Sequence, residues 1–371
     1  MKEKLGNYIK EISVRNKLNE DIPVYSVTNT EGFCKNFFNK DVTSNNKSNY
    51  KIVPKGYFAY NPSRINVGSI DWLRNEDKVL VSPLYNVFYV SEELNKQYLY
   101  YYLKSDIARQ QIKFYATGSV RDNLKLSALY EFRLNIPSIE KQKSIINKLN
   151  KIVSLIELKQ KQLTKLDELV KARFVEMFGD PLSGKYKTDY IKNIGKIISG
   201  ATPKTNVDKY WDGNIKWITP AEIDDNTFFI NDSIRHITKE GYDSCGTVIM
   251  PVGTVILSSR APIGKVAILS EKMCCNQGFK NIIPNERINS IYLYWVLKQS
   301  NQYLNSLGRG ATFKEISKQI VENIKITIPP INLQNKFADF VKQVDKSKFE
   351  IQKSIDETQM LFDSLMQKYF G

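Results

Sequence analysis

The sequence predicts an α+β fold in which two tandem globular domains are separated by two long helices that pair as a coiled coil. The first observation is a pseudo-twofold internal repeat, because residues 118–179 match residues 310–371 after a shift of 192 positions. The second is a mixture of short β-type runs and helix-like stretches in each copy. The third is an apolar ladder of helical spacing at the end of each copy. The ordered matches include Leu124 with Ile316, Ile136-Pro137 with Ile328-Pro329, Gln142 with Gln334, and Phe178-Gly179 with Phe370-Gly371.

Each globular domain combines short strands with an aromatic helix. Runs such as Val79-Leu80-Val81 and Val248-Ile249-Met250 favour strands, and turn clusters such as Asn61-Pro62-Ser63 separate them. The aromatic stretches at 97–103 and 291–297 have helical spacing, so we expect their rings in the core; stacking of these rings on nucleic-acid bases is the alternative. Strands and helices of this kind in one unit predict an α+β domain.

Two apolar ladders with the four-three spacing of a coiled-coil seam predict the long helices. The polar positions differ between the ladders, Lys159 and Arg173 in one and Lys348 and Thr358 in the other, so they are candidates for fixing the register. We expect the helices to pack on each other; packing of each helix only on its own domain is the alternative. The ladders are Ile145, Leu149, Ile152, Ile156, Lys159, Leu163, Leu166, Val170, Arg173, Met177 and Phe337, Val341, Val344, Lys348, Ile351, Ile355, Thr358, Phe362, Leu365, Tyr369.

Proline and glycine mark the ends of the long helices. Pro137 and Pro329-Pro330 precede them, and Gly179 and Gly371 follow them, as is typical of helix starts and stops. The predicted domains are therefore a first globular domain at 1–137, a central helix at 138–180, a second globular domain at 181–329 and a C-terminal helix at 330–371.

The chain is strongly basic, with a formal net charge of +15. Lys and Arg displace counterions from phosphates, so this charge favours a nucleic-acid partner; a solvated Lys-rich surface is the alternative. No apolar run is long enough for a membrane span and no signal core follows the start, so we expect a cytoplasmic protein without a membrane partner. The four cysteines lack metal-site spacing and are expected to be reduced core thiols: Cys34, Cys245, Cys274 and Cys275.

The sequence offers no catalytic constellation and no metal site. His236 is the only histidine, which argues against acid–base pairs or metal sites built on histidine. Residues 179–185 have the glycine and lysine spacing of a phosphate-binding loop, but Tyr186 replaces the Ser or Thr that holds magnesium, and the segment follows a helix. Neither Asn61-Pro62-Ser63-Arg64 nor Ile328-Pro329-Pro330-Ile331 is the Asn/Asp-Pro-Pro-aromatic box of adenine methyltransferases.

The alternation of globular domain and long helix resembles the specificity subunit (HsdS) of type I restriction–modification systems. The local motifs agree with this resemblance and together cover essentially the whole chain. The first domain departs from two of these motifs. It has Pro23-Val24-Tyr25-Ser26 in place of the tryptophan-containing opening motif, and Val81-Ser82-Pro83-Leu84 in place of the Asn-Gln-Gly-Phe motif. The motifs that carry the resemblance are Ile215-Lys216-Trp217-Ile218-Thr219-Pro220, Ser259-Arg260-Ala261-Pro262-Ile263-Gly264, Asn276-Gln277-Gly278-Phe279, Ile328-Pro329-Pro330 with Gln334, and Arg173-Phe174 with Met177-Phe178-Gly179-Asp180-Pro181.

The resemblance implies a non-catalytic subunit that recognises double-stranded DNA. Each globular domain would bind one half of a bipartite asymmetric target, and the paired helices would set the distance between the halves. Two modification (methyltransferase) subunits would bind S-adenosylmethionine and methylate adenine N6. Restriction (motor–nuclease) subunits would use ATP and magnesium. This chain itself would bind no cofactor.

Two groups of loops recur in both copies and are the predicted DNA contacts. One group comprises residues 64–68 and 260–264, and the other comprises residues 117–121 and 309–314. Basic residues beside glycine suit close approach to phosphates and base edges, and a turn whose Arg caps its own domain is the alternative. The predicted DNA-binding residues are Arg64, Thr117, Ser119, Arg121, Arg260, Asn276, Gln277, Arg309, Thr312 and Lys314.

Two other classes of function stay open at this level. One is a self-contained nuclease or methyltransferase with an unrecognised site, which incubation of the pure chain with DNA, magnesium and S-adenosylmethionine would reveal. The other is a coiled-coil scaffold that binds only protein, which a salt-dependent DNA shift assay would distinguish.

Overall fold

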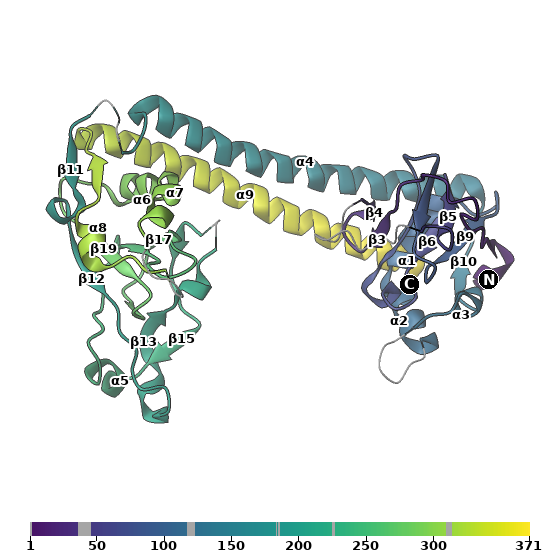
Figure 1. The fold of residues 1–371 in the computed structure, drawn as a ribbon, viewed down its shortest axis with the longest axis horizontal. Coiled ribbons are helices and arrows are strands. Elements are labelled where there is room, and N and C mark those ends of the chain that lie inside the picture. The colour runs from purple at the N-terminus through teal and green to yellow at the C-terminus, as the bar shows by residue number, and fades with distance from the viewer. Residues whose placement is uncertain are drawn as a thin grey trace. The chain divides into compact units, whose positions relative to one another are not determined.

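The computed structural model describes residues 2–35, 46–116, 123–182, 184, 186–224, 227–308 and 314–371. The chain divides into two compact units, residues 1–161 with 352–371 and residues 162–351. Each unit therefore holds one globular domain together with part of each long helix (Figure 1). The predicted α+β architecture with paired long helices is confirmed.

The two globular domains are built on the same sheet. In both domains the first four strands of this sheet are joined by antiparallel pairs, and the second domain adds β14 parallel to β17. The strand orders are β2(Ile9–Glu11)-β9(Asn86–Val90)-β6(Phe58–Tyr60)-β7(Ile70–Trp72) and β12(Gly195–Ser199)-β19(Lys280–Pro284)-β16(Val255–Leu257)-β17(Val266–Leu269)-β14(Phe229–Ile230).

Smaller strand groups complete each domain. A terminal ladder recurs in both domains, β1(Lys2–Lys4) with β10(Arg133–Asn135) and β11(Thr188–Tyr190) with β20(Lys325–Thr327), each antiparallel over three residue pairs. The remaining groups differ between the domains. They are β3(Ser26–Thr28)-β4(Gly32–Cys34) and β5(Lys51–Pro54)-β8(Lys78–Val81) in the first, and β15(Arg235–Ile237)-β13(Trp211–Ile218)-β18(Cys274–Cys275) in the second.

The aromatic helices are core elements, as predicted. Tyr98 in the first domain and Tyr292 in the second are buried, and each hydroxyl donates to a carbonyl of the terminal ladder, Asn135 O (3.0 Å) and Thr327 O (2.9 Å). The helices are α1(Lys96–Lys104), α2(Asp106–Tyr115) and α3(Leu126–Tyr130) in the first domain, and α5(Lys239–Asp243), α6(Ser290–Gln299), α7(Asn301–Ser306) and α8(Lys318–Glu322) in the second.

A buried glutamine ties each long helix to its own domain. The Gln142 side chain accepts from Asn95 N (2.8 Å) and donates to the carbonyls of Glu93 and Pro137. Gln334, which is equivalent in the repeat, accepts from Asn289 N (2.9 Å) and donates to the carbonyls of Arg287 and Pro329. Both glutamines have 0% exposure, so an unpaired amide there would carry the full cost of desolvation.

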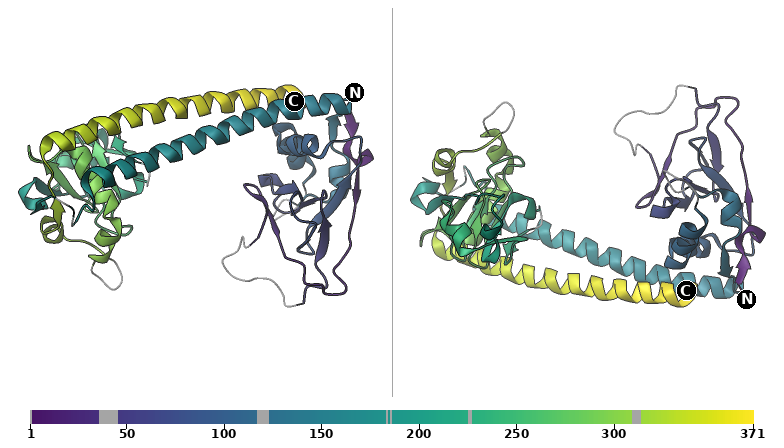
Figure 2. Two further views of the ribbon diagram at one scale, coloured as in Figure 1. Left: turned by 90° about the horizontal axis from the view of Figure 1, so that it is seen from above. Right: turned by 90° about the horizontal axis from the view of Figure 1, so that it is seen from below.

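The long helices α4(Ile139–Phe178) and α9(Ile331–Phe370) run antiparallel and lie side by side (Figures 1 and 2). In the first unit, the Lys159 ammonium donates to Ser354 O and to Thr358 Oγ1 (3.1 and 3.0 Å), so two polar seam positions meet. In the second unit, Lys348 pairs with Asp167 at 2.6 Å. The polar positions therefore match specific partners on the opposite helix, as expected of residues that fix register.

One predicted seam position is wrong. Arg173 is exposed and pairs with Glu176 at 2.7 Å, whereas Phe174 and Phe178 are buried with 0% exposure. At the end of α9, Met366 and Phe370 are buried in the equivalent places. A straight α-helix drifts from a strict seven-residue repeat, so the apolar face rotates toward the globular domain near the end of each helix.

The cysteines are free thiols in the structure. Burial raises the pKa of Cys274 to about 11 and that of Cys275 to about 12, so both thiols are protonated at neutral pH. Cys245 is only half-buried, which corrects its predicted place in the core. In the part of the chain that the structure describes, no helix is long and apolar enough to cross a membrane.

Candidate nucleic-acid interface

In each domain, the segment that follows the second predicted loop is hydrogen-bonded to the turn that carries Arg64 or Arg260. In the second domain, Ile316 N donates to Ser259 O (2.9 Å) and joins the segment after α7 to the turn that carries Arg260. In the first domain, Leu124 N donates to Pro62 O (3.1 Å) and makes the same connection beside Arg64. Leu124 and Ile316 are equivalent in the repeat, so both domains join these two segments through a backbone N–H at the same repeat position.

Three separate sequence motifs converge at this place in the second domain. Strand β13 pairs in parallel with β18, and Asn276 N donates to Ile218 O (3.1 Å) where the two strands end. Ser259 N then donates to Gly278 O (2.8 Å). A Cβ at Gly278 would lie 2.9 Å from Pro220 Cγ, so glycine allows the two turns to approach each other closely.

The Arg260 turn is held by its neighbours in the chain. The Ser258 hydroxyl donates to Pro262 O (2.8 Å) and accepts from Lys265 N (2.9 Å). Gly264 has a φ of +92° and Gly68, its equivalent in the first domain, has +86°. Glycine adopts this left-handed conformation without steric cost, which explains why both copies place it four residues after the arginine.

Two cations share one carboxylate beside this turn. The Arg260 Nε lies 3.1 Å from one oxygen of Glu315, and the Lys280 Nζ lies 3.3 Å from the other. The Lys280 side chain is only 8% exposed and also donates to the Ser259 hydroxyl (3.3 Å). Lys280 is thus a buried positive charge that depends on Glu315, while Arg260, half exposed, can turn outward to a phosphate.

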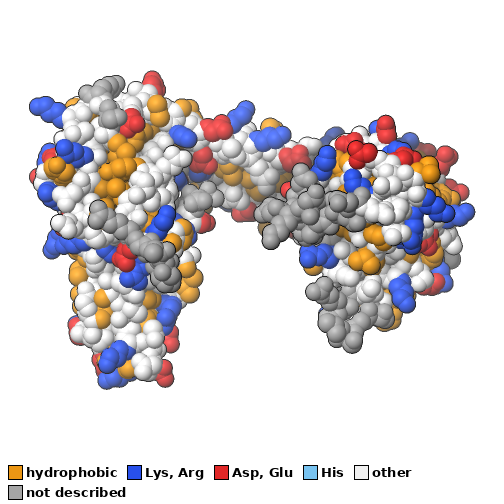
Figure 3. All heavy atoms as spheres, viewed as in Figure 1, with side chains coloured by type: hydrophobic (Ala, Val, Ile, Leu, Met, Phe, Trp, Pro, Cys, Tyr) orange, Lys and Arg blue, Asp and Glu red, His pale blue; other side chains and the backbone are white. Residues whose placement is uncertain are grey.

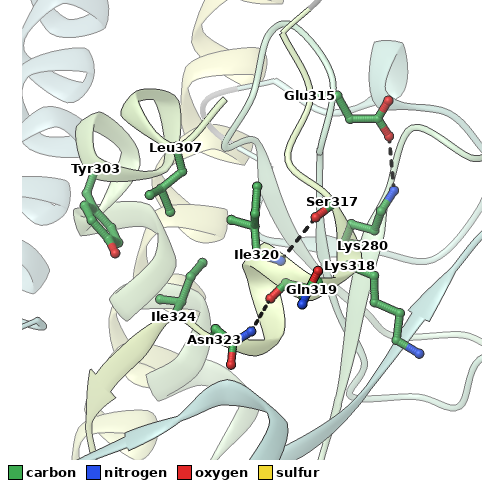
Figure 4. A pocket seen from close by; sticks show the side chains of 10 residues that line it. All are labelled: Lys280, Tyr303, Leu307, Glu315, Ser317, Lys318, Gln319, Ile320, Asn323 and Ile324. Carbon is green, nitrogen blue, oxygen red and sulfur yellow. Dashed lines mark hydrogen bonds and ion pairs between the residues drawn. The ribbon is translucent and has the colours of Figure 1, made fainter. Parts of the chain in front are cut away.

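A polar pocket of about 740 Å³ opens next to this ion pair (Figure 4). Helix α7 contributes Tyr303, which is followed by Leu307, and helix α8 lies on the opposite side, with the Ser317 hydroxyl accepting from Ile320 N (3.2 Å) at its start. Lys318 projects at the rim. The cavity therefore borders the Arg260–Glu315–Lys280 cluster, and its wall carries further hydroxyl, amide and ammonium groups.

The exposed positions of this surface are polar or basic. Gln277 and Lys314 are exposed, and the Thr202 hydroxyl donates to the Gln277 side chain. A Cβ at Gly308 would lie 2.8 Å from Ile263 Cδ1 and 3.3 Å from Lys314 Cβ, so Gly308 and Lys314 lie close together beside the Arg260 turn. Both basic and acidic side chains occur at the end of the second domain that carries β13, β15 and α5 (Figure 3).

The predicted residues fall into three groups. Arg64, Arg260, Gln277 and Lys314 are exposed. Asn276 is half-buried, and its side chain accepts from Gly278 N (2.9 Å), so it shapes its own turn. The others lie outside the described residues: Thr117, Ser119, Arg121, Arg309 and Thr312.

The first domain has the same turn with different side chains. Leu84 N donates to the Ser82 hydroxyl (3.5 Å), as Gly278 N does to Asn276. Val24 bridges Leu80 in parallel, as Trp217 bridges Cys274. The positions where the first domain departs from the family motifs therefore occupy the same structural places, so the two domains present different groups on a common frame.

Sequence reasoning missed Lys280, Glu315 and Arg235. Glu315 is adjacent to Lys314, but its role depends on two cations that are distant in the sequence. Arg235 stacks on two tryptophans of another strand. Trp217 belongs to one of the motifs that carry the family resemblance, but nothing in the sequence indicated which cation lies on its ring.

The described residues hold no group of three or more His, Cys, Asp or Glu side chains that could bind a metal. His236 follows Arg235 on strand β15, and its Nε2 atom lies 3.2 Å from Asp232 Oδ1. This is a surface contact between a half-buried imidazole and an exposed carboxylate. The arrangement suits binding of a polyanion through Arg, Lys and amide groups.

The comparisons with known proteins agree with this geometry. A family model described as "Type I restriction modification DNA specificity domain" matches residues 5–168 and 184–358. The type I restriction enzyme MjaIX specificity subunit of Methanocaldococcus jannaschii is 36% identical over 184 residues, which cover 48% of this chain and 43% of that protein. The EcoR124I/EcoR124II specificity subunit of Escherichia coli is 26% identical over 169 residues, 44% of this chain and 41% of that protein. The chain thus spans under half the length of these two relatives.

Other matches cover more of the chain. The putative MjaX specificity subunit of M. jannaschii is 23% identical over 333 residues, 82% of this chain and 75% of that protein. A chain from a structure on complex assembly and conformational transition of the type I R-M system has a TM-score of 0.66 at 16% identity, with 100% of this chain and 97% of that chain covered. The S subunit from M. genitalium has a TM-score of 0.56 at 14% identity, with 100% and 96% covered. These structures show a shared fold.

The family model covers most of both repeats, and the repeats share their sheet, their helix anchor and their loop arrangement. The chain therefore belongs to the family of type I restriction–modification DNA specificity (HsdS) subunits and carries two copies of its specificity domain.

Proposed function

We propose that this chain is the DNA-specificity subunit of a type I restriction–modification system and performs no chemistry itself. Its domains at 1–137 and 181–329 each bind one half of a bipartite, asymmetric duplex target. The observation that carries this proposal is that both domains hydrogen-bond equivalent segments to the turns of Arg64 and Arg260 but present different exposed side chains there. A common frame with different surfaces is what recognition of two unlike half-sites requires.

The partner subunits supply the chemistry in this proposal. Two modification subunits bind S-adenosylmethionine and methylate adenine N6, and restriction subunits use ATP and magnesium to translocate and cleave DNA. This chain selects the target through Arg, Lys and amide groups, and the paired helices α4 and α9 set the distance between the half-sites. No residue of this chain is assigned to a cofactor.

Sequencing the methylome of cells with and without this gene tests the proposal. We expect one bipartite adenine motif, two short specific halves separated by a non-specific spacer, to be methylated only when the gene is present. Identical methylomes in a strain that expresses the modification subunits would overturn the proposal and favour a scaffold that binds protein only.

Replacing Arg260 with Ala should weaken DNA binding, and Lys314→Ala should do the same. If each residue contacts a phosphate, the loss is similar for all sequences and the salt slope of the binding constant falls by about one. The measurement is the affinity of the full chain for target and non-target duplexes between low and moderate salt.

Arg287→Ala is the matched control for Arg260→Ala. Arg287 is 46% exposed and pairs with Asp189 at 2.8 Å, much as Arg260, 50% exposed, pairs with Glu315, but Arg287 lies beside the Gln334 anchor of the long helix. Equal losses of DNA affinity for the two arginine variants would mean that only the net charge of the chain matters. The Arg260 loop would then no longer be assigned to the DNA interface.

The purified chain alone should neither cleave nor methylate DNA. The reason is that the sequence carries no methyl-donor or nuclease motif and the described residues form no metal cluster. The measurement is incubation with plasmid DNA, magnesium and S-adenosylmethionine, followed by a cleavage assay and quantification of N6-methyladenine. Turnover that follows this chain through every purification step would favour the self-contained enzyme instead.

A further inference from the structure

We propose that Arg235 is a base-recognising residue of the second domain and that it binds the paired acceptors of a guanine through a guanidinium held on a tryptophan platform. This inference rests on the proposed DNA-recognition function. It assigns a specific contact to a strand edge that the predicted interface did not include.

The platform consists of Trp211 and Trp217 on strand β13. Their rings meet edge to face, with centroids 5.1 Å apart and planes at 82°, and both residues are buried, with 7% and 3% exposure. Arg235 lies on the neighbouring strand β15, directly opposite Trp217. Its guanidinium carbon is 3.5 Å from the centre of the Trp211 ring and 5.8 Å from that of Trp217. Such stacking fixes the plane of the fork before any ligand binds.

The guanidinium of Arg235 is otherwise uncommitted. Arg235 is exposed, and its side chain makes no hydrogen bond or ion pair with any residue in the described ranges. The nearby carboxylate of Asp232 is within 3.2 Å of His236 and 4.0 Å of Lys216. By contrast, the exposed Arg260 is paired with Glu315. Arg235 therefore presents its donors to solvent in a preset plane.

The platform is tied to the predicted interface through one segment, residues 201–204. The indole N–H of Trp217 donates to Ala201 O (3.0 Å), and that of Trp211 donates to Lys204 O (3.2 Å). Thr202, between these two carbonyls, donates to the side chain of Gln277. The segment thus connects the Arg235 platform directly to the Asn276–Gly278 turn, which makes Arg235 part of the same surface.

A fixed planar fork favours a base edge over a phosphate. Guanine offers O6 and N7 in the major groove, and bidentate binding requires the guanidinium to lie nearly in the plane of the base. A phosphate can also bind the fork through two hydrogen bonds, but it accepts Lys as a point charge as well, so only the base edge depends on the fixed plane. The first domain has Val24 in the place of Trp217 and therefore lacks this platform. The guanine preference is expected in one half-site only.

Methylome sequencing of cells that carry Arg235→Ala or Arg235→Lys chains with wild-type modification subunits tests the inference. We expect both variants to relax a single guanine position in one half-site, with a loss of discrimination there of roughly 5- to 150-fold, while the other half-site is unchanged. Arg235→Lys keeps the positive charge but loses the planar guanidinium, so this variant distinguishes a contact with a base from a contact with a phosphate. Arg287→Ala is the control and should leave the motif intact.

Other outcomes overturn the inference. A normal motif with Arg235→Lys and uniformly weaker methylation with Arg235→Ala would assign Arg235 to a phosphate. An unchanged motif with both variants, relaxation in both half-sites, or equal loss at all sites would also remove Arg235 as a base-recognising residue. Failure of the proposed function is a different result, because the wild-type gene would then change no bipartite motif at all.

Discussion

Inserting seven residues into both long helices is expected to lengthen the non-specific spacer of the target by about three base pairs. One heptad keeps the apolar seam in phase and adds about 10 Å, since a helix rises about 1.5 Å per residue and a DNA turn of about 34 Å holds ten base pairs. The insertions belong after Lys161 in α4 and after Ile351 in α9, where the two units divide. These sites leave the Lys159–Thr358 contact and the Lys348–Asp167 pair intact.

The measurement is methylation-motif sequencing of the double-insertion variant with wild-type partner subunits. The two half-site sequences should survive, because neither globular domain is altered. Insertion into α4 alone is the control, and it should abolish or strongly reduce methylation because it shifts the seam of one helix against the other. A double-insertion variant that methylates with an unchanged spacer would show that the helices do not set the distance.

Truncating Phe178 to Ala is expected to lower the free energy of unfolding of the second unit by about 3–5 kcal/mol. Phe178 has 0% exposure at the end of α4, and its ring centre lies 4.8 Å from that of Tyr292 and 5.4 Å from that of Phe337. The substitution removes a side chain to which both long helices and α6 contribute contacts, so the cavity cannot close easily.

Urea unfolding followed by tryptophan fluorescence measures this loss, because three of the four tryptophans, including Trp295, belong to the second unit. Phe349→Ala is the matched control: Phe349 lies on α9 in the same unit, is 67% exposed and should change stability by no more than about 0.5 kcal/mol. Similar urea midpoints of unfolding for the two variants would mean that the end of α4 is not part of the core that unfolds cooperatively in the second unit.

Much of the fold could be predicted because the repeat and the helix period are local properties. Gln142 with Gln334 and Gly68 with Gly264 match in the sequence, and each pair has the same hydrogen bonds or the same backbone conformation in the structure. The predicted seam is wrong at Arg173 because a ladder of constant spacing does not follow the gradual rotation of the apolar face along a straight helix. The side chains of Phe174 and Phe178 are instead buried against the globular domain.

The candidate site was only partly predictable, because it is assembled from segments far apart in the chain. The sequence indicated Arg260, Gln277 and Lys314 as separate motif residues, but not that Glu315 pairs with both Arg260 and Lys280. Nor could it place Arg235 on the two tryptophans, since that contact depends on the register between β13 and β15.

The sequence by itself determined the repeated α+β units, the two long helices and the absence of recognisable catalytic motifs, because periodicity, glycine positions and motif spacing are encoded along the chain. Only the tertiary structure decided which basic residues are committed to internal partners and which are presented to solvent. Whether an arginine is paired, as Arg260 is, or held open on an aromatic face, as Arg235 is, depends on strand pairing and burial between distant segments. Those interactions are non-local, and one sequence does not specify them by pattern alone.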